Sequence, residues 1–374
     1  MKPLRIGIDA SSLAFPFSGI GRYTSEVLSR WISTDHHFYL YSTRAFDPSQ
    51  FLGRNTHLSV LIPPFGIPSG IWFQTKLPSL CSRHRLDAFW SPAHRLPVFL
   101  DKSILSFVSI HDLVWRKAPQ TMKWRTFLMD SLLMPMSLKR AYGVFSVSNS
   151  TKRDILEFSP DCSKKTIVTP LGVMPASHQE LPANFLAKEY ILFVGTAEPR
   201  KNLGRLIDAF SRLPAVTKAS FNFVFVTGKG WGGVNLMKLL DIYGLQEQCI
   251  VLSNVENGLL SSLYKKAAFV VLPSIYEGFG LPIIEAISNG TPVLTSNLSS
   301  MPEVAGRAGL FVDPYSIESI SRGLQLLMED KSFRLSLAEE CASQAIKYDW
   351  DKTASLALEA IERSFSPSPK KSEI

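Results

Sequence analysis

The chain has 374 residues, and at about 100 to 200 residues per domain this length predicts two domains. Its 45% hydrophobic and 19% charged residues are typical of globular proteins and exclude a disordered chain, and no run reaches the roughly 18 apolar residues of a membrane span. The net charge of +8 lies in the first half: residues 1–180 hold 21 Lys and Arg against 12 Asp and Glu, whereas 181–374 hold 19 against 20. A basic half suits nucleic acid, an anionic membrane or a diphosphate substrate, or is simply a solvated surface.

The first apolar run, MKPLRIGIDASS, predicts a strand that enters a loop, without the apolar core and cleavage site of a signal peptide. We therefore expect a cytoplasmic protein. The four cysteines are 80 to 90 residues apart, so neither disulfides nor a zinc site is indicated and we expect buried free thiols.

Short apolar runs alternate with helical patterns through the first half of the chain. This alternation favours a parallel sheet wrapped by helices. The expected strands are 4–10, 37–42, 57–63, 87–92, 104–110, 144–148 and 166–170, with a helix from about Ile20.

The same alternation restarts after a loop at 171–189. The expected strands there are 190–196, 221–228, 249–253, 269–274, 292–296 and 310–313. The fold class is therefore α/β with two Rossmann-like, doubly wound domains, and such sheets bind ligands beyond their C-terminal strand ends, so we expect them to face a central cleft. We assign 1–175 and 185–345 to the two domains, 346–364 to a final helix packing on the first domain, and 365–374 to a disordered tail.

The segment 122–140, MKWRTFLMDSLLMPMSLKR, mixes large apolar side chains with four basic residues. It is typical of a helix lying on a membrane surface. Such a stretch is more often an ordinary half-buried helix, and the sequence leaves both interpretations open.

Two motifs of the first half stand where strands end. FPFSGIGRY places Gly19 and Gly21 between the first strand and its helix, and SIHDL places His111 and Asp112 at the end of the strand 104–110. A histidine at such a strand end has either a polar role in a cleft or a structural one.

In the second half, the strand YILFVGT runs into AEPRKN and then into a helix. Cations beside a helix N-terminus add to the field of its unpaired N–H groups, which is a good environment for phosphate. Arg200 and Lys201 are therefore candidate anion ligands, although an exposed basic pair would look the same.

The glycines of GKGWGG, residues 228–233, match the dinucleotide-binding spacing G-x-G-x-x-G. That fingerprint belongs after the first strand of a domain, with an acidic residue ending the next strand, and here that strand ends in Ser253-Asn254. We interpret these glycines as a turn near a nucleotide.

The stretch SIYEGFGLPIIEAISNG, residues 274–290, follows a buried strand and leads into a helix. Pro282 suits the start of that helix, which places Glu285 in its first turn, and the N–H groups of Phe279, Gly280 and Leu281 are expected to be free. N–H groups beside the carboxylates of Glu277 and Glu285 fit a nucleotide sugar, while Glu285 alone would also fit a helix-capping acid.

Taken together, these motifs resemble the retaining glycosyltransferases of family 4, which have two Rossmann-like domains in the GT-B arrangement. Among that family the chain looks most like bacterial mannosyltransferases of O-antigen, capsule and exopolysaccharide assembly. The matching motifs are SGIGRY, SIHDL, FSVSNST, TPLGV, GTAEPRKNL, YEGFGLPIIEA and GTPVL.

The resemblance implies a role for each candidate residue. Glu277 would contact the hydroxyls of the donor sugar, Glu285 the ribose and Lys201 the donor phosphates. His111 would lie against the donor sugar, and the loop of Gly19 would close over the diphosphate.

This sequence departs from the family pattern at two positions. Many members carry a phosphate-binding Arg where this chain has Thr196, and Arg200 is the candidate to replace it. Many also have two adjacent glycines in the first loop, where this chain has Ser18-Gly19.

The reaction that the resemblance implies transfers a hexose with retention, without a cofactor or metal. The resemblance favours GDP-mannose as the donor, although UDP-hexoses would make the same contacts with the protein. The expected partners are this donor, a saccharide or polyprenyl-diphosphate-linked acceptor and an anionic membrane surface, but not nucleic acid. A nucleotide-sugar 2-epimerase and a non-catalytic sugar-nucleotide-binding subunit remain as alternatives.

Overall fold

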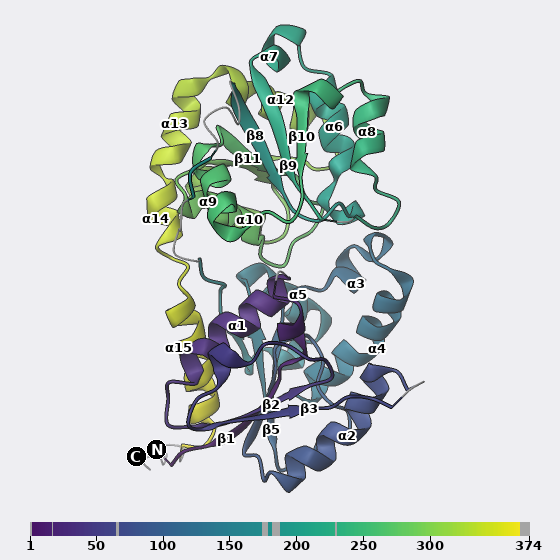
Figure 1. Ribbon diagram of the computed structural model, residues 1–374, viewed down its shortest axis with the longest axis vertical. Helices are drawn as coiled ribbons and strands as arrows, with labels where there is room; N and C mark the ends of the chain where they lie inside the picture. Colours follow the sequence, from purple (N-terminus) through teal and green to yellow (C-terminus); the bar gives the residue numbers. More distant parts are fainter. Residues whose placement is uncertain are drawn as a thin grey trace. The chain divides into compact units, whose positions relative to one another are not determined.

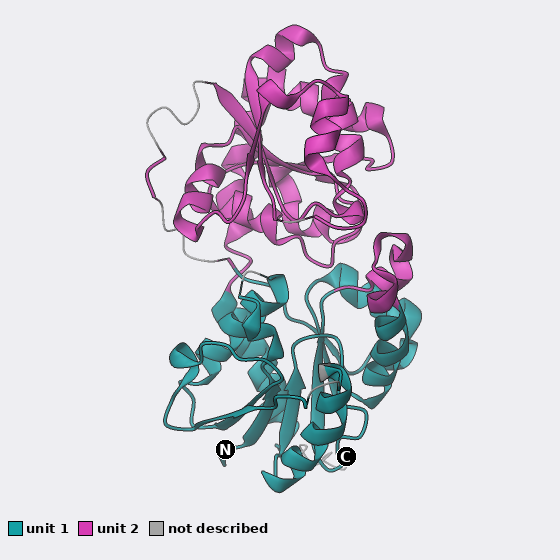
Figure 2. Ribbon diagram, turned by 45° about the vertical axis from the view of Figure 1, so that its right-hand side comes forward, with its two compact units in different colours: residues 1–111, 128–172, 350–374 teal, residues 112–127, 173–349 magenta. Residues whose placement is uncertain are grey.

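The computed structural model describes residues 2–16, 18–64, 67–173, 179–181, 188–228 and 230–366. The chain divides into two units, which Figure 2 colours separately. Unit 1 comprises Met1–His111, Leu128–Gly172 and Trp350–Ile374, and unit 2 comprises Asp112–Phe127 and Val173–Asp349. Most of the expected linker at 171–189 and of the tail at 365–374 lies outside the described residues.

Unit 1 is built on a seven-stranded parallel sheet in the order β3-β2-β1-β4-β5-β6-β7. The strands are β1 (Arg5–Asp9), β2 (His37–Ser42), β3 (Thr56–Val60), β4 (Ala88–Ser91), β5 (Leu105–Ile110), β6 (Gly143–Ser146) and β7 (Thr166–Val168). All residues of β4 and β6 are buried, as expected for strands that are covered on both faces.

The helices of unit 1 flank this sheet (Figure 1). They are α1 (Gly19–Trp31), α2 (Ser69–Arg83), α5 (Asn149–Phe158), α15 (Trp350–Arg363) and, from Leu128 onward, α4 (Trp124–Arg140). The C-terminal α15 packs along α1, where the buried indole of Trp31 donates a hydrogen bond of 2.9 Å to the Ala354 carbonyl. The helix α15 therefore belongs to the core of unit 1, although it follows unit 2 in sequence.

Unit 2 has a six-stranded parallel sheet in the order β10-β9-β8-β11-β12-β13. Its strands are β8 (Glu189–Val194), β9 (Phe221–Val226), β10 (Cys249–Leu252), β11 (Phe269–Leu272), β12 (Val293–Ser296) and β13 (Gly309–Val312). The prediction of two Rossmann-like α/β units is thus confirmed, and each expected apolar run forms a strand within a few residues of its predicted bounds.

The helices of unit 2 form two groups, α6 with α8 and α12, and α10 with α9, α11 and α14 (Figure 1). They are α3 (Val114–Lys117), α6 (Leu203–Ser211), α7 (Ala215–Ala219), α8 (Leu236–Ile242), α9 (Asn257–Lys266), α10 (Leu281–Ser288), α11 (Met301–Ala305), α12 (Ile317–Glu329), α13 (Lys331–Glu339) and α14 (Cys341–Ala345). Across the described ranges of both units, every helix is too short or too polar to cross a membrane.

Gly21 in α1 offers a test of the close packing at the start of this helix. A methyl group at Gly21 would clash with the backbone carbonyl of Phe15, which cannot move aside as a flexible side chain would. We expect Gly21→Ala to lower the free energy of unfolding by about 1–3 kcal/mol, measured by urea denaturation. Gly70→Ala in α2 is the matched control, because its methyl group meets no atom within 4 Å, and it should leave stability unchanged or raise it. Equal effects of the two substitutions would contradict this packing.

Candidate functional site

The two central strands of unit 2 mark the point where its chain order reverses. β8 pairs with β9 on one side and with β11 on the other, so the connections that leave β8 and β11 run to opposite faces of the sheet. In such sheets ligands bind beyond the carboxyl ends of these two strands. Thr196, Arg200 and Lys201 follow β8, and Glu277 follows β11, so the sequence-predicted residues of unit 2 collect at this point.

Glu277 lies at the centre of a buried ion cluster. Its side chain is 7% exposed, and Lys201 donates to Oε1 at 2.7 Å while Arg200 donates to Oε2. The Ser274 hydroxyl donates a third hydrogen bond to Oε1, also at 2.7 Å. Both carboxylate oxygens are therefore occupied by charged or hydroxyl donors.

The pKa of Glu277 reflects this environment. Burial by itself would raise the pKa, but the charges of Arg200 and Lys201 and the hydrogen bonds from Lys201 and Ser274 outweigh it and lower the pKa to about 2. For Arg200 burial acts against the charged form, but the carboxylates of Glu277, Glu198 and Asp112 raise its pKa. The cluster is consequently a carboxylate between two cations, and Glu277 has no proton to give at neutral pH.

The backbone of residues 199–202 holds both cations against β11. Arg200 and Lys201 form a single 3-10 turn, which ends at Asn202 in the left-handed conformation (φ 62°), and α6 starts at the next residue. The Asn202 amide bonds the carbonyls of Pro273 and Pro314 at 3.1 and 2.7 Å, and the Arg200 carbonyl accepts from the Ile275 N–H at 2.9 Å. These bonds tie the segment after β8 to the segment after β11.

Glu198 is a member of this site that the sequence reasoning did not identify. Its carboxylate accepts from Arg200 at 2.6 Å and from the Trp231 indole at 3.0 Å. The sequence signal was present, since Glu198 is the acid in AEPRKN and Trp231 stands within GKGWGG. Glu198 thus fixes Arg200 from the side opposite Glu277.

The GKGWGG loop has a packing role in the described residues, which exclude Lys229. A side chain at Gly230 would press on the Ala197 carbonyl, and the Trp231 N–H donates to that same oxygen at 3.0 Å. The glycines therefore let this loop lie against the segment after β8. Whether it also lies near a nucleotide stays a prediction.

Two serines that sequence reasoning missed hold the loop after Glu277. The Ser299 hydroxyl accepts from the Glu277 N–H at 3.0 Å, and the buried Ser300 hydroxyl bonds the carbonyls of Glu277 and Phe279 at 2.8 and 2.9 Å. Gly280 ends this loop with φ 97°, a conformation that other residues rarely adopt, and α10 starts at Leu281. The N-terminus of α10 therefore opens directly beside the ion cluster.

The predicted place of Glu285 in the first turn of its helix is wrong. Because α10 starts at Leu281, Glu285 is its fifth residue and belongs to the second turn. Its carboxylate accepts a hydrogen bond of 2.8 Å from the Tyr264 hydroxyl of α9. The Tyr264 hydroxyl therefore orients the Glu285 carboxylate.

The remaining predicted residues belong to unit 1. Gly19 is the first residue of α1, capped by the Ser18 hydroxyl, which accepts from the Gly21 N–H at 3.0 Å. His111 directly follows β5 and is 9% exposed, with its Nε2 2.7 Å from the Pro92 carbonyl and its ring edge-on to Tyr23 at 4.9 Å. A carbonyl only accepts, so Nε2 of His111 carries a hydrogen.

Next to His111 lies His94, which the sequence reasoning also missed. It follows β4 with φ 63°, and its ring centroid is 5.3 Å from that of His111. Strained backbone of this kind gathers at functional sites, and no periodicity or spacing in the sequence reveals it.

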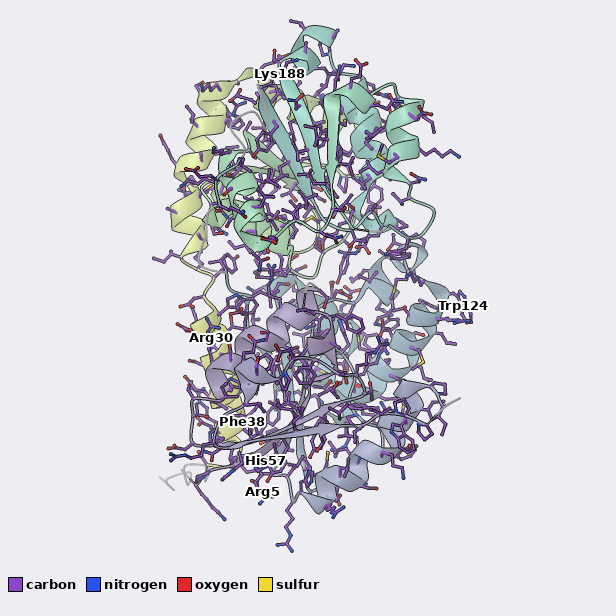
Figure 3. The ribbon with its side chains drawn as sticks, viewed as in Figure 1. Arg5, Arg30, Phe38, His57, Trp124 and Lys188 are labelled. Atoms are coloured by element: carbon purple, nitrogen blue, oxygen red, sulfur yellow. The ribbon has the colours of Figure 1, made fainter. Side chains whose placement is uncertain are left out.

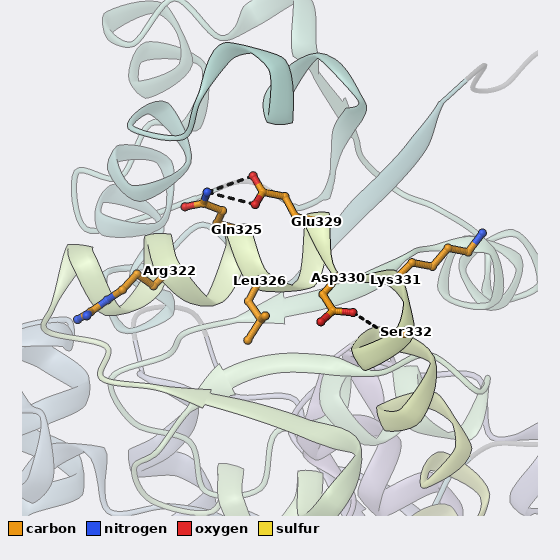
Figure 4. A pocket seen from close by; sticks show the side chains of 7 residues that line it. All are labelled: Arg322, Gln325, Leu326, Glu329, Asp330, Lys331 and Ser332. Atoms are coloured by element: carbon orange, nitrogen blue, oxygen red, sulfur yellow. Dashed lines mark hydrogen bonds between the residues drawn. The ribbon is translucent and has the colours of Figure 1, made fainter.

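Other features of the described residues are remote from this chemistry. A hollow of about 680 Å³ between α12 and α13 is lined by Arg322, Gln325, Glu329 and Asp330, among others, and within it Gln325 bonds Glu329 and Ser332 bonds Asp330 (Figure 4). It contains none of the predicted residues. Within the described part of the chain, no group of three or more His, Cys, Asp and Glu side chains is placed to hold a metal ion.

The ion cluster predicts a pH-dependent contribution of Glu277 to stability. Glu277→Gln leaves two buried cations without their carboxylate, and we expect the free energy of unfolding at pH 7 to fall by about 3–5 kcal/mol. Because the folded pKa is lowered to about 2, this stabilisation is complete above the ordinary pKa of 4.5 and is lost as the pH falls toward 2. The difference between wild type and variant in urea unfolding should therefore shrink across that range.

The control for this measurement is Glu318→Gln, which removes an exposed carboxylate that pairs with the exposed Arg212. Such a pair is worth about 0–1 kcal/mol, so its loss should change little at any pH. A Glu277→Gln variant as stable as wild type at pH 7 would contradict the buried cluster.

Comparison with known proteins identifies the family. Residues 178–348 match the family of glycosyl transferases group 1. O-antigen chain mannosyltransferase B of Escherichia coli is 27% identical over 385 residues, which cover 96% of this chain and 99% of the relative.

Two solved structures share the fold over almost the whole chain. WaaG, a glycosyltransferase involved in lipopolysaccharide biosynthesis, superimposes with a TM-score of 0.75 at 16% identity, covering 96% of this chain and 99% of WaaG. HepE of Anabaena, solved with UDP and glucose, gives a TM-score of 0.76 at 15% identity and covers 96% and 100%. The resemblance seen in the motifs is therefore confirmed: residues 178–348 match the group 1 glycosyl transferases, and the chain as a whole has the GT-B fold and is similar to O-antigen mannosyltransferases.

Proposed function

We propose that this glycosyltransferase moves mannose from GDP-mannose, with retention of configuration, to a saccharide or polyprenyl-diphosphate-linked saccharide in cell-surface polysaccharide biosynthesis. The observation that carries the proposal is the cluster of Arg200, Lys201 and Glu277 beside the N-terminus of α10, at the reversal point of the unit 2 sheet. This arrangement offers cations and helix N–H groups to a diphosphate and a carboxylate to sugar hydroxyls.

Each predicted residue takes a role in donor binding. Lys201 and Arg200 bind the diphosphate, together with the N–H groups of residues 279–281, since the first turn of a helix leaves its N–H groups without intrahelical acceptors. Glu277 accepts from hydroxyls of the sugar. Thr196, exposed after β8, borders the phosphate.

The ribose and the sugar are held from two further places. Glu285 accepts from the ribose hydroxyls, which suits a half-buried carboxylate already oriented by the Tyr264 hydroxyl. From unit 1, Gly19 at the start of α1 contacts the diphosphate, and His111 contacts the transferred sugar.

The charges at Glu277 favour same-face transfer over a double displacement. A double displacement needs one carboxylate as nucleophile and a second as acid, about 5 Å apart. Here Glu277 is bonded to two cations and a serine, and Glu285 is assigned to the ribose, so that Glu277 has no partner carboxylate at the reacting carbon. In the proposed step the acceptor oxygen bonds to the anomeric carbon, the bond to the diphosphate oxygen breaks with its electron pair, and that oxygen takes the acceptor proton.

The leaving diphosphate develops negative charge in this step, and Lys201 and Arg200 stabilise it without a metal. Before the donor binds, Glu277 and Glu198 together balance the charges of the two cations. We infer that the phosphates compete with this carboxylate for Lys201, which frees Glu277 to accept from the sugar.

The choice of mannose, and of the place of action, rests on the relatives. The Escherichia coli relative is named an O-antigen chain mannosyltransferase, whereas HepE was solved with UDP and glucose. GDP-mannose is therefore the first donor to test and UDP-glucose the second. We propose that the enzyme acts in the cytoplasm, at the inner face of a membrane, where it would meet an acceptor that is destined for the cell surface.

A donor panel and two variants test this proposal. We expect GDP and GDP-mannose to raise the melting temperature more than UDP and ADP forms, since a ligand at 100 times its Kd adds about 2.7 kcal/mol of stability. Lys201→Ala and Glu277→Ala should lower kcat for mannosyl transfer by roughly 10²–10³-fold or more, because charge stabilisation of the leaving group is lost. Transfer by either variant at the wild-type rate would disprove the assignment, and conversion of the donor without any acceptor would indicate an epimerase.

The absence of a metal from the proposed step gives a separate prediction. Transfer measured after treatment with EDTA should proceed at the untreated rate, because Lys201 and Arg200 supply the charge. The control is readdition of Mg²⁺ or Mn²⁺ to the treated enzyme, which should have no effect. Activity that disappears with EDTA and returns with either ion would refute the metal-free step.

A further inference from the structure

The helix α4 differs from an ordinary surface helix, because large apolar side chains line its outward side while two of its polar side chains are buried. Its inward side carries Asp130, Met134, Ser137 and Leu138, which are buried. Its outward side carries Leu128, Leu132 and Met136 at intervals of four residues, and these are 55%, 58% and 42% exposed. A helix that faces water normally shows the opposite pattern.

The inward polar groups are fully used in holding the helix to unit 1. Asp130 accepts two hydrogen bonds from Arg95, at 2.6 and 2.9 Å. The Ser137 hydroxyl accepts from the Leu96 N–H and donates to the Leu133 carbonyl, both at 2.8 Å. The apolar outward stripe is therefore a property of the folded helix, which these bonds fix in one rotation.

The outward stripe continues onto the neighbouring loop and into a groove. Phe99 on that loop is 71% exposed, and the groove beside it holds about 640 Å³. The groove is lined by Leu96, Val98, Lys102, Met136, Lys139 and Arg140, among others. We define the α4 face as Leu128, Leu132, Met136, Phe99, Lys102, Lys139 and Arg140.

The charges of the α4 face are almost all positive. Lys102 and Lys139 are exposed, and Arg140 donates to the carbonyls of Leu100 and Asp101 at 3.2 and 2.7 Å. Asp130 is the one acid on α4, and it is neutralised by Arg95. Asp101 is the acid of the neighbouring loop, and its carboxylate accepts from Ser103.

Trp124 extends the apolar stripe toward the start of α4. It is the first residue of the helix, four positions before Leu128, and is 69% exposed (Figure 3). Tryptophan is enriched at the boundary between lipid headgroups and acyl chains, where its ring is amphipathic.

We propose that the α4 face is the surface by which this enzyme rests on an anionic lipid bilayer. This proposal rests on the proposed function, since it names the surface of the enzyme that would contact the membrane carrying the acceptor. The leucines and Phe99 enter the headgroup region to a depth of about 5–10 Å, and the lysines pair with lipid phosphates. A bilayer is favoured over a protein partner because the face combines isolated large apolar side chains with a rim of cations and almost no acids.

Vesicle cosedimentation of the full chain tests the proposal. We expect binding to vesicles of phosphatidylcholine with phosphatidylglycerol, weak binding to phosphatidylcholine alone, and a loss of binding between 0.1 M and 1 M salt, where the screening length falls from about 10 to about 3 Å. Leu128→Ser with Leu132→Ser, and separately Lys102→Gln with Lys139→Gln, should each lower partitioning roughly tenfold or more. Leu326→Ser with Lys331→Gln in unit 2 is the matched control, because both residues are exposed, and it should bind as wild type does.

Two further measurements separate this proposal from the proposed function and from other occupants. The variants of the α4 face should keep the wild-type thermal shift with sugar nucleotides, so a chain that binds vesicles but no nucleotide would disprove the function and leave the surface standing. Variants that sediment with anionic vesicles as wild type does would overturn the proposal. It would equally be overturned if the variants altered the oligomeric mass in lipid-free light scattering, because the face would then join two copies of the chain.

Discussion

The candidate site of unit 2 depends on one buried carboxylate, that of Glu277. Burial opposes its charge, and the two cations from the neighbouring segment, with the Ser274 hydroxyl, keep it ionised. Removing either partner would leave a charge in a poorly solvated place, which costs far more than the pair itself contributes. The ions therefore hold the segments after β8 and β11 together, and they do so at the place where Rossmann-like sheets bind ligands.

The surrounding hydrogen bonds give these ions a fixed geometry. Asn202 ties the first segment to the second, Ser300 holds the loop after Glu277, and Glu198 with Trp231 orients Arg200. Such outer contacts restrict the side chains before a ligand arrives, so that less ordering is needed when it binds. In the proposed reaction the same charges would meet a sugar hydroxyl and a diphosphate.

Unit 1 has the same strand order as unit 2 but a different surface. Its sheet follows the order of unit 2 with one more strand, yet its chain carries the excess of basic residues and the helix α4 with its apolar side outward. The reason for this arrangement is local, because Asp130 and Ser137 find partners only on the inward side. Fold and surface thus vary independently in the two units. In our proposal unit 2 binds the nucleotide and unit 1 meets the lipid-linked acceptor, although both have the same architecture.

Both sheets could be predicted from the amino-acid sequence. Strands that are buried on both faces of a parallel sheet are continuous apolar runs, and such a run is visible without any knowledge of the segments that pack against it. The sequence also predicted Arg200, Lys201 and Glu277 at the C-terminal ends of strands, since residues that come soon after a strand in the chain lie near that end of it. Tertiary contacts were needed to bring these three into one ion cluster, to bond Glu285 of the second turn of α10 to Tyr264, and to set Glu198, Ser299 and Ser300 against the cluster. Contacts between segments far apart in the chain decide which charges form ion pairs, how a helix is rotated about its axis and which residues take positive φ. Neither periodicity nor motif spacing in the sequence reports such contacts.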